Sequence, residues 1–264
     1  MYSFNASPTI WNPLKGFVPY YYGTNSQPAV NFPHSMENQY FPMKDLILGS
    51  NSFDFSSIDA ILMNVASNRY DGDIRIGFWQ IGFLGHCGEW HTSPNITYFA
   101  SSYHQNQVLS AFNSSFVQTK IQLRYFDVTG NSNAQSWNVG FHDDSFFQDT
   151  YGEAWMFYNT SVTVGATNQW RNQPIGGEVR PELWPCVFSS DPATDCQAIT
   201  TVVPLNWTDC VQLTHSSYQW LSYAFTSPGY SGADYGRAIY GSIMQRYSFF
   251  VSQITANEMN CSGT

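Results

Sequence analysis

The sequence predicts an α/β fold of the TIM-barrel-like (β/α) type, with a largely parallel sheet. Short apolar runs recur between polar, turn-rich loops, and stretches with helical periodicity lie between some of them. Polar and ionisable residues follow successive runs, as they do at the active face of a (β/α)8 barrel. The 264 residues suffice for one such barrel, so we expect a single domain over residues 1–264.

The individual elements follow from the period of the apolar residues. Apolar runs bounded by turn residues predict strands. These strands are expected at 16–22, 73–83, 120–126, 137–142, 173–179, 210–216 and 247–254. Apolar residues at helical spacing predict helices at 53–67, 106–119 and 217–225.

Composition narrows the class of partner. Charged residues make up 11% of the chain, against roughly 25% in an average soluble domain, whereas aromatic residues make up 17%. Aromatic faces stack on sugar rings, so we expect a carbohydrate or polysaccharide partner. The net charge of −9 and the scattered Lys and Arg residues argue against nucleic acid. No apolar run has the length of a membrane span, and no nucleotide-binding motif predicts a cofactor.

Cysteines and sequons predict a secreted glycoprotein. Cys186, Cys196, Cys210 and Cys261 crowd the last third of the chain, which indicates at least one disulfide in an oxidising compartment, with Cys87 free. The shortest pairings are Cys186–Cys196 and Cys196–Cys210. The N-terminus lacks a signal-peptide pattern, so either a leader has been removed or the protein is cytosolic, and the cysteines and sequons favour removal. The N-x-[ST] sequons, a modest excess over chance, begin at Asn5, Asn95, Asn113, Asn159, Asn206 and Asn260.

Two glutamates are the candidate catalytic residues. Glu89 in "GEWH" and Glu178 in "GGEVRPE" come at the ends of two different predicted strands. Glycoside hydrolysis needs such a pair, one carboxylic acid to protonate the leaving oxygen and one carboxylate to attack or to activate water. The alternative is structural, with each glutamate capping a helix or pairing with a neighbour such as Arg180.

Further polar residues follow other predicted strands. His142, Asp143 and Asp144 lie together in "GFHDDSF", where they suit sugar hydroxyls, a plain loop turn or a metal ion. A metal would need a further ligand from another histidine, and the histidine spacing is not that of the H-E-x-x-H pattern, so we expect no metal. Arg124 either tunes a nearby carboxylate or forms a structural ion pair.

Several long blocks resemble one known family. They are "NPLKGFVPYY" at 12–21, "RYDGDIRIGFWQIGFLGHCGEWHT" at 69–92, "VGFHDDSF" at 139–146, "QPIGGEVRPELWP" at 173–185 and "LTHSSYQWL" at 213–221. In this order they resemble the secreted proteins of the domain of unknown function 4832 family. The resemblance implies a TIM-like barrel related to the large glycosidase superfamily with one catalytic glutamate after strand four and one after strand seven, positions that Glu89 and Glu178 match.

The chain departs from that family in two places. Cys87 stands where the family usually has a tryptophan beside the first glutamate. About two βα units are also absent near Met63, where 53–63 runs almost directly into the block at 69–92. We therefore expect an incomplete or gapped barrel, with at most one helix in this stretch.

Three hypotheses follow from these residues. The first is a secreted glycoside hydrolase-like protein with a retaining mechanism, in which Glu89 is the acid/base and Glu178 the nucleophile. The second is a non-catalytic carbohydrate-binding protein on a degenerate barrel. The third is a metal-dependent hydrolase built on His142 and Asp143. The residues expected to bind substrate in the first hypothesis are Trp90, His91, Arg124, His142, Asp143, Asp144, Arg180 and His215.

Overall fold

The fold is described from a computed structural model. The described residues are 15–19, 32–34, 36, 45, 47–49, 52–54, 71–73, 76–126 and 139–245.

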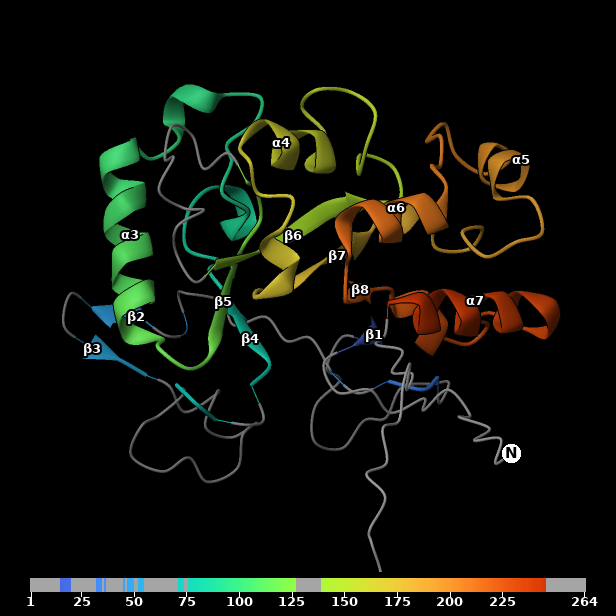
Figure 1. The fold of residues 1–264 in the computed structure, drawn as a ribbon, viewed down its shortest axis with the longest axis horizontal. Helices are drawn as coiled ribbons and strands as arrows, with labels where there is room; N and C mark the ends of the chain where they lie inside the picture. Colours follow the sequence, from blue (N-terminus) through green and yellow to red (C-terminus); the bar gives the residue numbers. More distant parts are fainter. Residues whose placement is uncertain are drawn as a thin grey trace, which may run out of the picture.

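The centre of the molecule is a curled, six-stranded parallel sheet (Figure 1). Its strand order is β1-β8-β7-β6-β5-β4, and every neighbouring pair is parallel. Strands that are consecutive from β4 to β8 are thus neighbours, and the last strand pairs with the first, as in a (β/α)8 barrel. The strands are β1 (Gly16–Val18), β4 (Phe78–Gln80), β5 (Lys120–Leu123), β6 (Val139–Phe146), β7 (Ile175–Val179) and β8 (Tyr218–Trp220).

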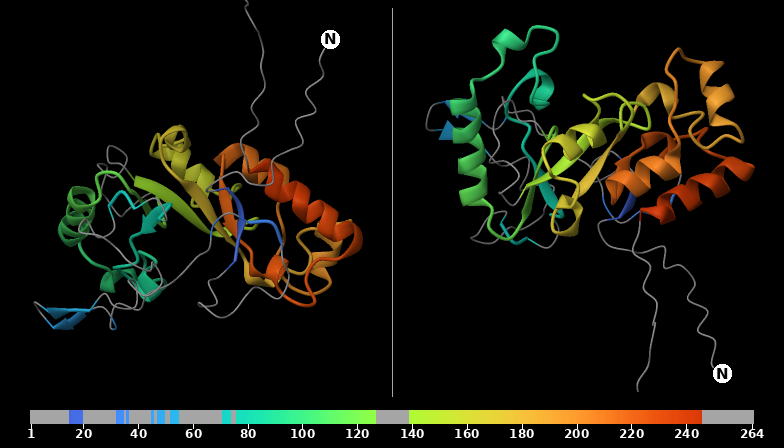
Figure 2. Two further views of the ribbon diagram at one scale, coloured as in Figure 1. Left: turned by 90° about the horizontal axis from the view of Figure 1, so that it is seen from below. Right: turned by 45° about the horizontal axis from the view of Figure 1, so that its top comes forward.

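Helices lie along the convex side of this sheet (Figures 1 and 2). Within the described ranges no helix is long and apolar enough to cross a membrane. A separate antiparallel hairpin of β2 (Ile47–Gly49) and β3 (Ser52–Phe53) lies near the lower end of α3 in Figure 1. The α-helices are α3 (Ser102–Ser115), α4 (Phe157–Thr163), α5 (Pro192–Gln197), α6 (Trp207–Thr214) and α7 (Gly232–Met244). The 3-10 turns are η1 (His86–Gly88), η2 (Ile96–Tyr98), η4 (Gln169–Arg171), η5 (Pro181–Leu183) and η6 (Ser222–Phe225).

Two apolar clusters join the helices to the sheet. One lies under α3 and α4 and includes Leu109, Ile121 and Phe141. The other lies under α6 and α7 and includes Phe17 and Trp207. Burial of these side chains, at about 25 cal/mol per Å² of apolar surface, fixes the outer face of the sheet against the helices. The inner face of the sheet is therefore the one that polar residues can occupy.

The predicted α/β class is confirmed, and the parallel sheet is open in the part of the chain that the structure describes. Here β1 and β4 each pair on one side only, so the sheet forms about half of a barrel. The predicted strands at 16–22, 73–83, 120–126, 137–142 and 173–179 each overlap an observed strand, and α3 confirms the helix predicted at 106–119. The stretch near Met63 and the strand predicted at 247–254 lie outside the described residues.

Two adjacent predictions are wrong and have exchanged places. The strand predicted at 210–216 is part of α6, and the helix predicted at 217–225 contains β8 followed by η6. The side chain of Asn206 accepts a hydrogen bond from the backbone N–H of Asp209, which is the N-cap of a helix. The helix ends at His215 in the left-handed conformation, and the chain then enters the sheet between β7 and β1.

The predicted disulfide is confirmed. Cys186 and Cys196 are bonded, ten residues apart, while Cys87 is free and exposed. Cys210, a residue of α6, is free and buried, and Cys261 lies outside the described residues. The bond closes the loop that carries α5.

Opening this disulfide is expected to destabilise the protein. Closing a loop of this length lowers the entropy of the unfolded chain, which stabilises the folded protein by about 3 kcal/mol. The double variant Cys186→Ala and Cys196→Ala should therefore lower the free energy of unfolding, measured in urea, by that amount. Thiol titration of the unfolded, unreduced protein should find at most three reactive cysteines. Five reactive cysteines would contradict the bond.

Candidate functional site

A cluster of charged side chains occupies the carboxyl ends of four neighbouring strands. Glu89 follows β4, Arg124 follows β5, Asp144 lies in β6 and Glu178 in β7. Parallel strands end at the same edge of a sheet, so residues that are far apart in the sequence meet there. We call these four residues the charged cluster.

The loop after β4 is built to hold Glu89. Gly85 and Gly88 have φ of 85° and 76°, and a Cβ on either would come within 2.4 Å of a backbone oxygen. Both positions therefore require glycine. The loop is closed by hydrogen bonds from the backbone N–H of Glu89 to His86 and of Trp90 to Leu84, each 2.8 Å long. Trp90 anchors it, because its buried indole donates to the carbonyl of Ile81.

Arg124 joins the carboxyl groups of the cluster. Its side chain is 6% exposed, and its Nη2 lies 3.1 Å from Oε1 of Glu89. Its Nη1 lies 2.5 Å from Oδ1 of Asp144. A buried guanidinium of this kind neutralises the carboxylates around it, and each partner needs the other because an unpaired buried charge is costly. The arrangement also holds the loop after β4 to β5 and β6.

His91 and Tyr125 complete the rim of the cluster. Nε2 of His91 lies 3.3 Å from Oε2 of Glu89, so Glu89 has one partner on each oxygen. The ring of His91 packs edge-on against Tyr125, with centroids 5.9 Å apart. Burial and the nearby carboxylate of Asp144 raise the pKa of the Tyr125 hydroxyl.

Strand alternation separates residues that adjoin in the sequence. His142 and Asp144 lie on the inner face of β6, and Nε2 of His142 is 3.6 Å from Oδ1 of Asp144. Asp143 points to the outer face, where it accepts hydrogen bonds from the Thr150 hydroxyl (2.8 Å) and the backbone N–H of Ser145 (3.1 Å). The structure thus brings Asp144 to the cluster and keeps Asp143 from it.

A buried polar chain below the cluster was not found from the sequence. Tyr218 of β8 donates a 2.7 Å hydrogen bond to Oε1 of Gln122 and is 2.9 Å from Nδ1 of His142. Its ring crosses Gly176 of β7, where a Cβ would lie 2.1 Å from a ring carbon. The glycine pair in "PIGGEV" was the available signal, because a glycine inside a strand indicates close approach of another group.

Burial controls protonation in this region. Burial raises the pKa of Glu178 to about 7, with Arg124 opposing this shift and the charges of Asp144 and Glu89 adding to it. Burial also raises the pKa of Asp144 to about 7, against the effect of Arg124. Burial and Arg124 together lower the pKa of His142 well below its usual value. Three carboxyl groups thus share one guanidinium beside a neutral imidazole, which favours retention of a proton near neutral pH.

The remaining predicted residues have their contacts outside the cluster. Trp90 is 5% exposed and belongs to the apolar core. Arg180 follows β7 and pairs with Glu182, with Nε and Oε2 3.2 Å apart. His215 precedes β8 and stacks on Trp170, so it lies at the amino end of the sheet, opposite the cluster.

Trp220 of β8 was also missed, because its segment was predicted to be helical. It is the register neighbour of Glu178, so the two side chains lie on the same face of the sheet. Its half-buried indole donates to the hydroxyl of Ser222 and lies 6.5 Å from the ring of Trp184. A broad ring thus adjoins one of the two glutamates.

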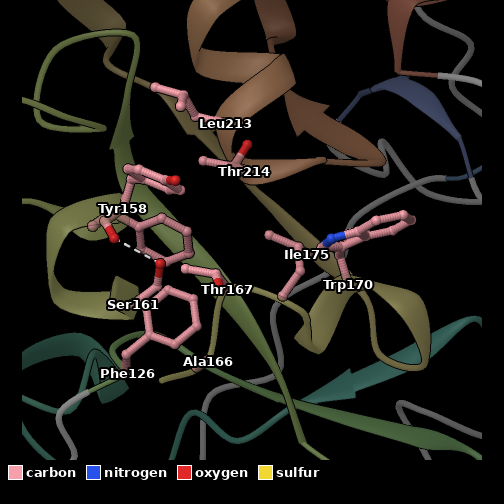
Figure 3. A pocket seen from close by; sticks show the side chains of 10 residues that line it. Phe126, Tyr158, Ser161, Ala166, Thr167, Trp170, Ile175, Leu213 and Thr214 are labelled. Carbon is pink, nitrogen blue, oxygen red and sulfur yellow. Dashed lines mark hydrogen bonds between the residues drawn. The ribbon is translucent and has the colours of Figure 1, made fainter. Parts of the chain in front are cut away.

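A small pocket lies on the other side of the sheet. Figure 3 shows this shallow space, which Phe157, Trp170, Ile175 and Thr214 help to line. The Ser161 hydroxyl donates to the carbonyl of Tyr158 at its edge. The lining includes no carboxylate or basic side chain, so we place the candidate site at the charged cluster.

Within the described ranges, no three or more His, Cys, Asp and Glu side chains are grouped to hold a metal ion. His142 and Asp143, the basis of the metal-hydrolase hypothesis, point to opposite faces of β6.

Comparison of the chain with protein families, curated proteins and solved structures finds no match.

Replacing Arg124 is expected to be strongly destabilising. Arg124→Met leaves the partly buried carboxylates of Glu89 and Asp144 without their cation and should lower the free energy of unfolding by about 3 kcal/mol. Adding Asp144→Asn should restore part of this loss, since it removes one of the unpaired charges. The matched control is Arg180→Met, which breaks a half-exposed pair and should cost less than about 1 kcal/mol. Equal losses in urea unfolding for the two arginine variants would contradict the central role of Arg124.

The free energy of unfolding is expected to fall as pH rises from about 5 to 7. In this window the folded chain keeps protons on Glu178 and Asp144 that the unfolded chain has released, because burial raises the pKa of each group to about 7. Each such proton contributes a slope of about −1.4 kcal/mol per pH unit. The two carboxyl groups together outweigh the opposite slope from buried His142, whose lowered pKa leaves it unprotonated in the folded chain. Glu178→Gln should flatten the profile measured by urea unfolding. A profile that rises over this window, or is the same in the variant, would contradict the raised pKa.

Proposed function

We propose that this protein is a glycoside hydrolase-like enzyme that acts on a polysaccharide at the charged cluster. The observation that carries the proposal is the position of Glu89 and Glu178 after different parallel strands, around one buried Arg124. Two carboxyl groups in different electrostatic environments are what glycosidic bond cleavage requires.

The environments favour roles opposite to those expected from the sequence. Glu89 is directly paired with Arg124 and His91, and both contacts can orient its carboxylate as the nucleophile. Burial raises the pKa of Glu178 to about 7, which suits an acid that keeps its proton. In this assignment Glu178 protonates the leaving oxygen while the Glu89 carboxylate attacks the anomeric carbon. Glu178 then takes a proton from the water that hydrolyses the glycosyl–enzyme ester.

The polar and aromatic groups around the pair suit a sugar. Trp220, beside Glu178, offers a flat apolar face on which a pyranose ring can stack. His91 and Asp144 offer hydrogen-bonding groups on the other side of the cluster. Asp143, Arg180, Trp90 and His215 take no part in this proposal because of where they lie.

The proposal includes the architecture and the compartment. The six-stranded sheet would be part of a (β/α)8 barrel that lacks strands between β1 and β4, as the resemblance to the domain of unknown function 4832 family suggests. The Cys186–Cys196 disulfide supports an oxidising, extracellular compartment. Membership in that family and secretion both remain predictions.

A second candidate is a carbohydrate-binding protein without catalysis. The observation that favours it is the sheet itself, which in the described residues is open between β1 and β4. An open sheet supplies fewer strand ends to hold a substrate. Exposed Cys87, beside Glu89, also leaves that side of the site without a large ring.

A glycan panel with three variants separates these candidates. Wild type, Glu89→Gln and Glu178→Gln are assayed for release of reducing sugar and for glycan binding, with exposed Glu153→Gln as the matched control. The enzyme proposal predicts that both site variants lose at least about a hundredfold in turnover and keep binding, while the control is unchanged. Binding with no hydrolysis by wild type would support the second candidate, and neither activity nor binding would contradict both.

Azide rescue assigns the two roles. An aryl glycoside with a good leaving group needs no acid, so Glu178→Ala should still form the glycosyl–enzyme, and azide should give a product of retained configuration. Glu89→Ala lacks the nucleophile, so azide should give the inverted product. The opposite result would restore the sequence-based roles, with Glu89 as acid/base and Glu178 as nucleophile.

A further inference from the structure

The orientation of one buried amide is fixed by the backbone. Gln122 of β5 is fully buried, and its Nε2 donates to the carbonyls of Phe141 (2.9 Å) and Pro174 (3.2 Å). Carbonyl oxygens only accept, so the amide nitrogen must face them. The amide oxygen of Gln122 must then face the opposite way, toward Gln80 and Tyr218.

This orientation determines which atom donates at Tyr218. An amide oxygen only accepts, so the single hydroxyl hydrogen of Tyr218 points to Oε1 of Gln122, 2.7 Å away. The hydroxyl oxygen can then only accept from Nδ1 of His142, 2.9 Å away. The Nδ1 atom of His142 must therefore carry a hydrogen.

We propose that Gln122 and Tyr218 fix neutral His142 with its hydrogen on Nδ1, and that its Nε2 accepts a hydrogen bond from the protonated carboxyl group of Asp144. His142 is 3% exposed, and its Nε2 lies 3.6 Å from Oδ1 of Asp144. This Nε2 has no hydrogen-bond partner in the described part of the chain. A small movement brings the two atoms to hydrogen-bond distance. His142 then acts as a positioning residue, which decides where the proton of the charged cluster resides.

The surrounding charges make this proton necessary. The groups around His142 are several acids and a single cation, Arg124. Burial of the imidazole and the positive charge of Arg124 both disfavour a positive charge on His142. A proton shared by Asp144 and His142 leaves Arg124 available to Glu89, and this consequence for catalysis rests on the function proposed above. The titratable and charged groups that face this region are Glu89 after β4, Arg124 and Tyr125 after β5, Asp144 in β6, Glu178 in β7 and Tyr218 in β8.

Nitrogen NMR of the histidines tests the proposal without a substrate. Protein labelled with 15N-histidine is recorded between pH 6 and 8 by long-range 1H–15N correlation, and the His142 signals are assigned by their loss in His142→Gln. The expected spectrum has a protonated Nδ1 and an unprotonated Nε2. A neutral His142 with its hydrogen on Nε2, or an imidazolium, would overturn the proposal. The wild-type spectrum alone distinguishes these three states of His142.

Two variants test the partners of His142. Tyr218→Phe removes the acceptor of the Nδ1 hydrogen and should change the tautomer or the charge of His142, whereas Tyr151→Phe, whose hydroxyl bonds to Asp209, should leave both unchanged. Asp144→Asn should move the Nε2 resonance, and an unmoved resonance would overturn the shared proton. A protein with the expected spectrum and no hydrolytic activity would contradict only the proposed function.

Discussion

The buried guanidinium of Arg124 is the interaction on which the candidate site depends. It lies between Glu89 and Asp144, which come from loops and strands on either side of β5. Without a cation these acids, together with Glu178, would be three partly buried negative charges at one edge of the sheet. One guanidinium balances only part of that charge, so the cluster favours retention of a proton. In the function proposed above, this retained proton makes Glu178 the acid, and the Glu89 carboxylate is the nucleophile.

The fold supplies the positions of these groups through its packing. The apolar face of the sheet is fixed against α3, α4, α6 and α7, so alternate residues of each strand are forced to the inner face. Glycines then make room where the chain must come close. Gly85 and Gly88 allow the turn that presents Glu89, and Gly176 allows Tyr218 to reach His142 across β7. The polar interior is therefore as closely specified as the apolar core.

Sequence patterns predicted the parallel class and much of the cluster for a physical reason. Polar residues after apolar runs meet at one edge only when the strands are parallel, and this reasoning brought Glu89, Arg124, Asp144 and Glu178 together. It failed at His215, because the strand assigned before that residue is the helix α6 that Asn206 caps. The cap was readable in the sequence, and the apolar period of the segment obscured it.

Other features depend on tertiary packing that no local pattern encodes. Adjacent Asp143 and Asp144 have opposite roles because β6 alternates between its two faces. The hydrogen-bonded chain from Gln122 through Tyr218 to His142 joins three strands. Tyr218 is 76 residues from His142 and 96 residues from Gln122 in the sequence. Trp90, which adjoins Glu89 in sequence, turns into the core instead. Neighbours in sequence were thus poor guides to neighbours in the site.

The most direct test of the charged cluster is the titration of Glu178 itself. In protein labelled with 13C at the glutamate side-chain carboxyl, its resonance is assigned by its loss in Glu178→Gln and followed from pH 3 to pH 9. The account predicts a midpoint raised from the usual 4.5 to about 7, because burial and the charges of Asp144 and Glu89 outweigh Arg124. A midpoint near 4.5 would contradict it, since Glu178 would then hold no proton at neutral pH.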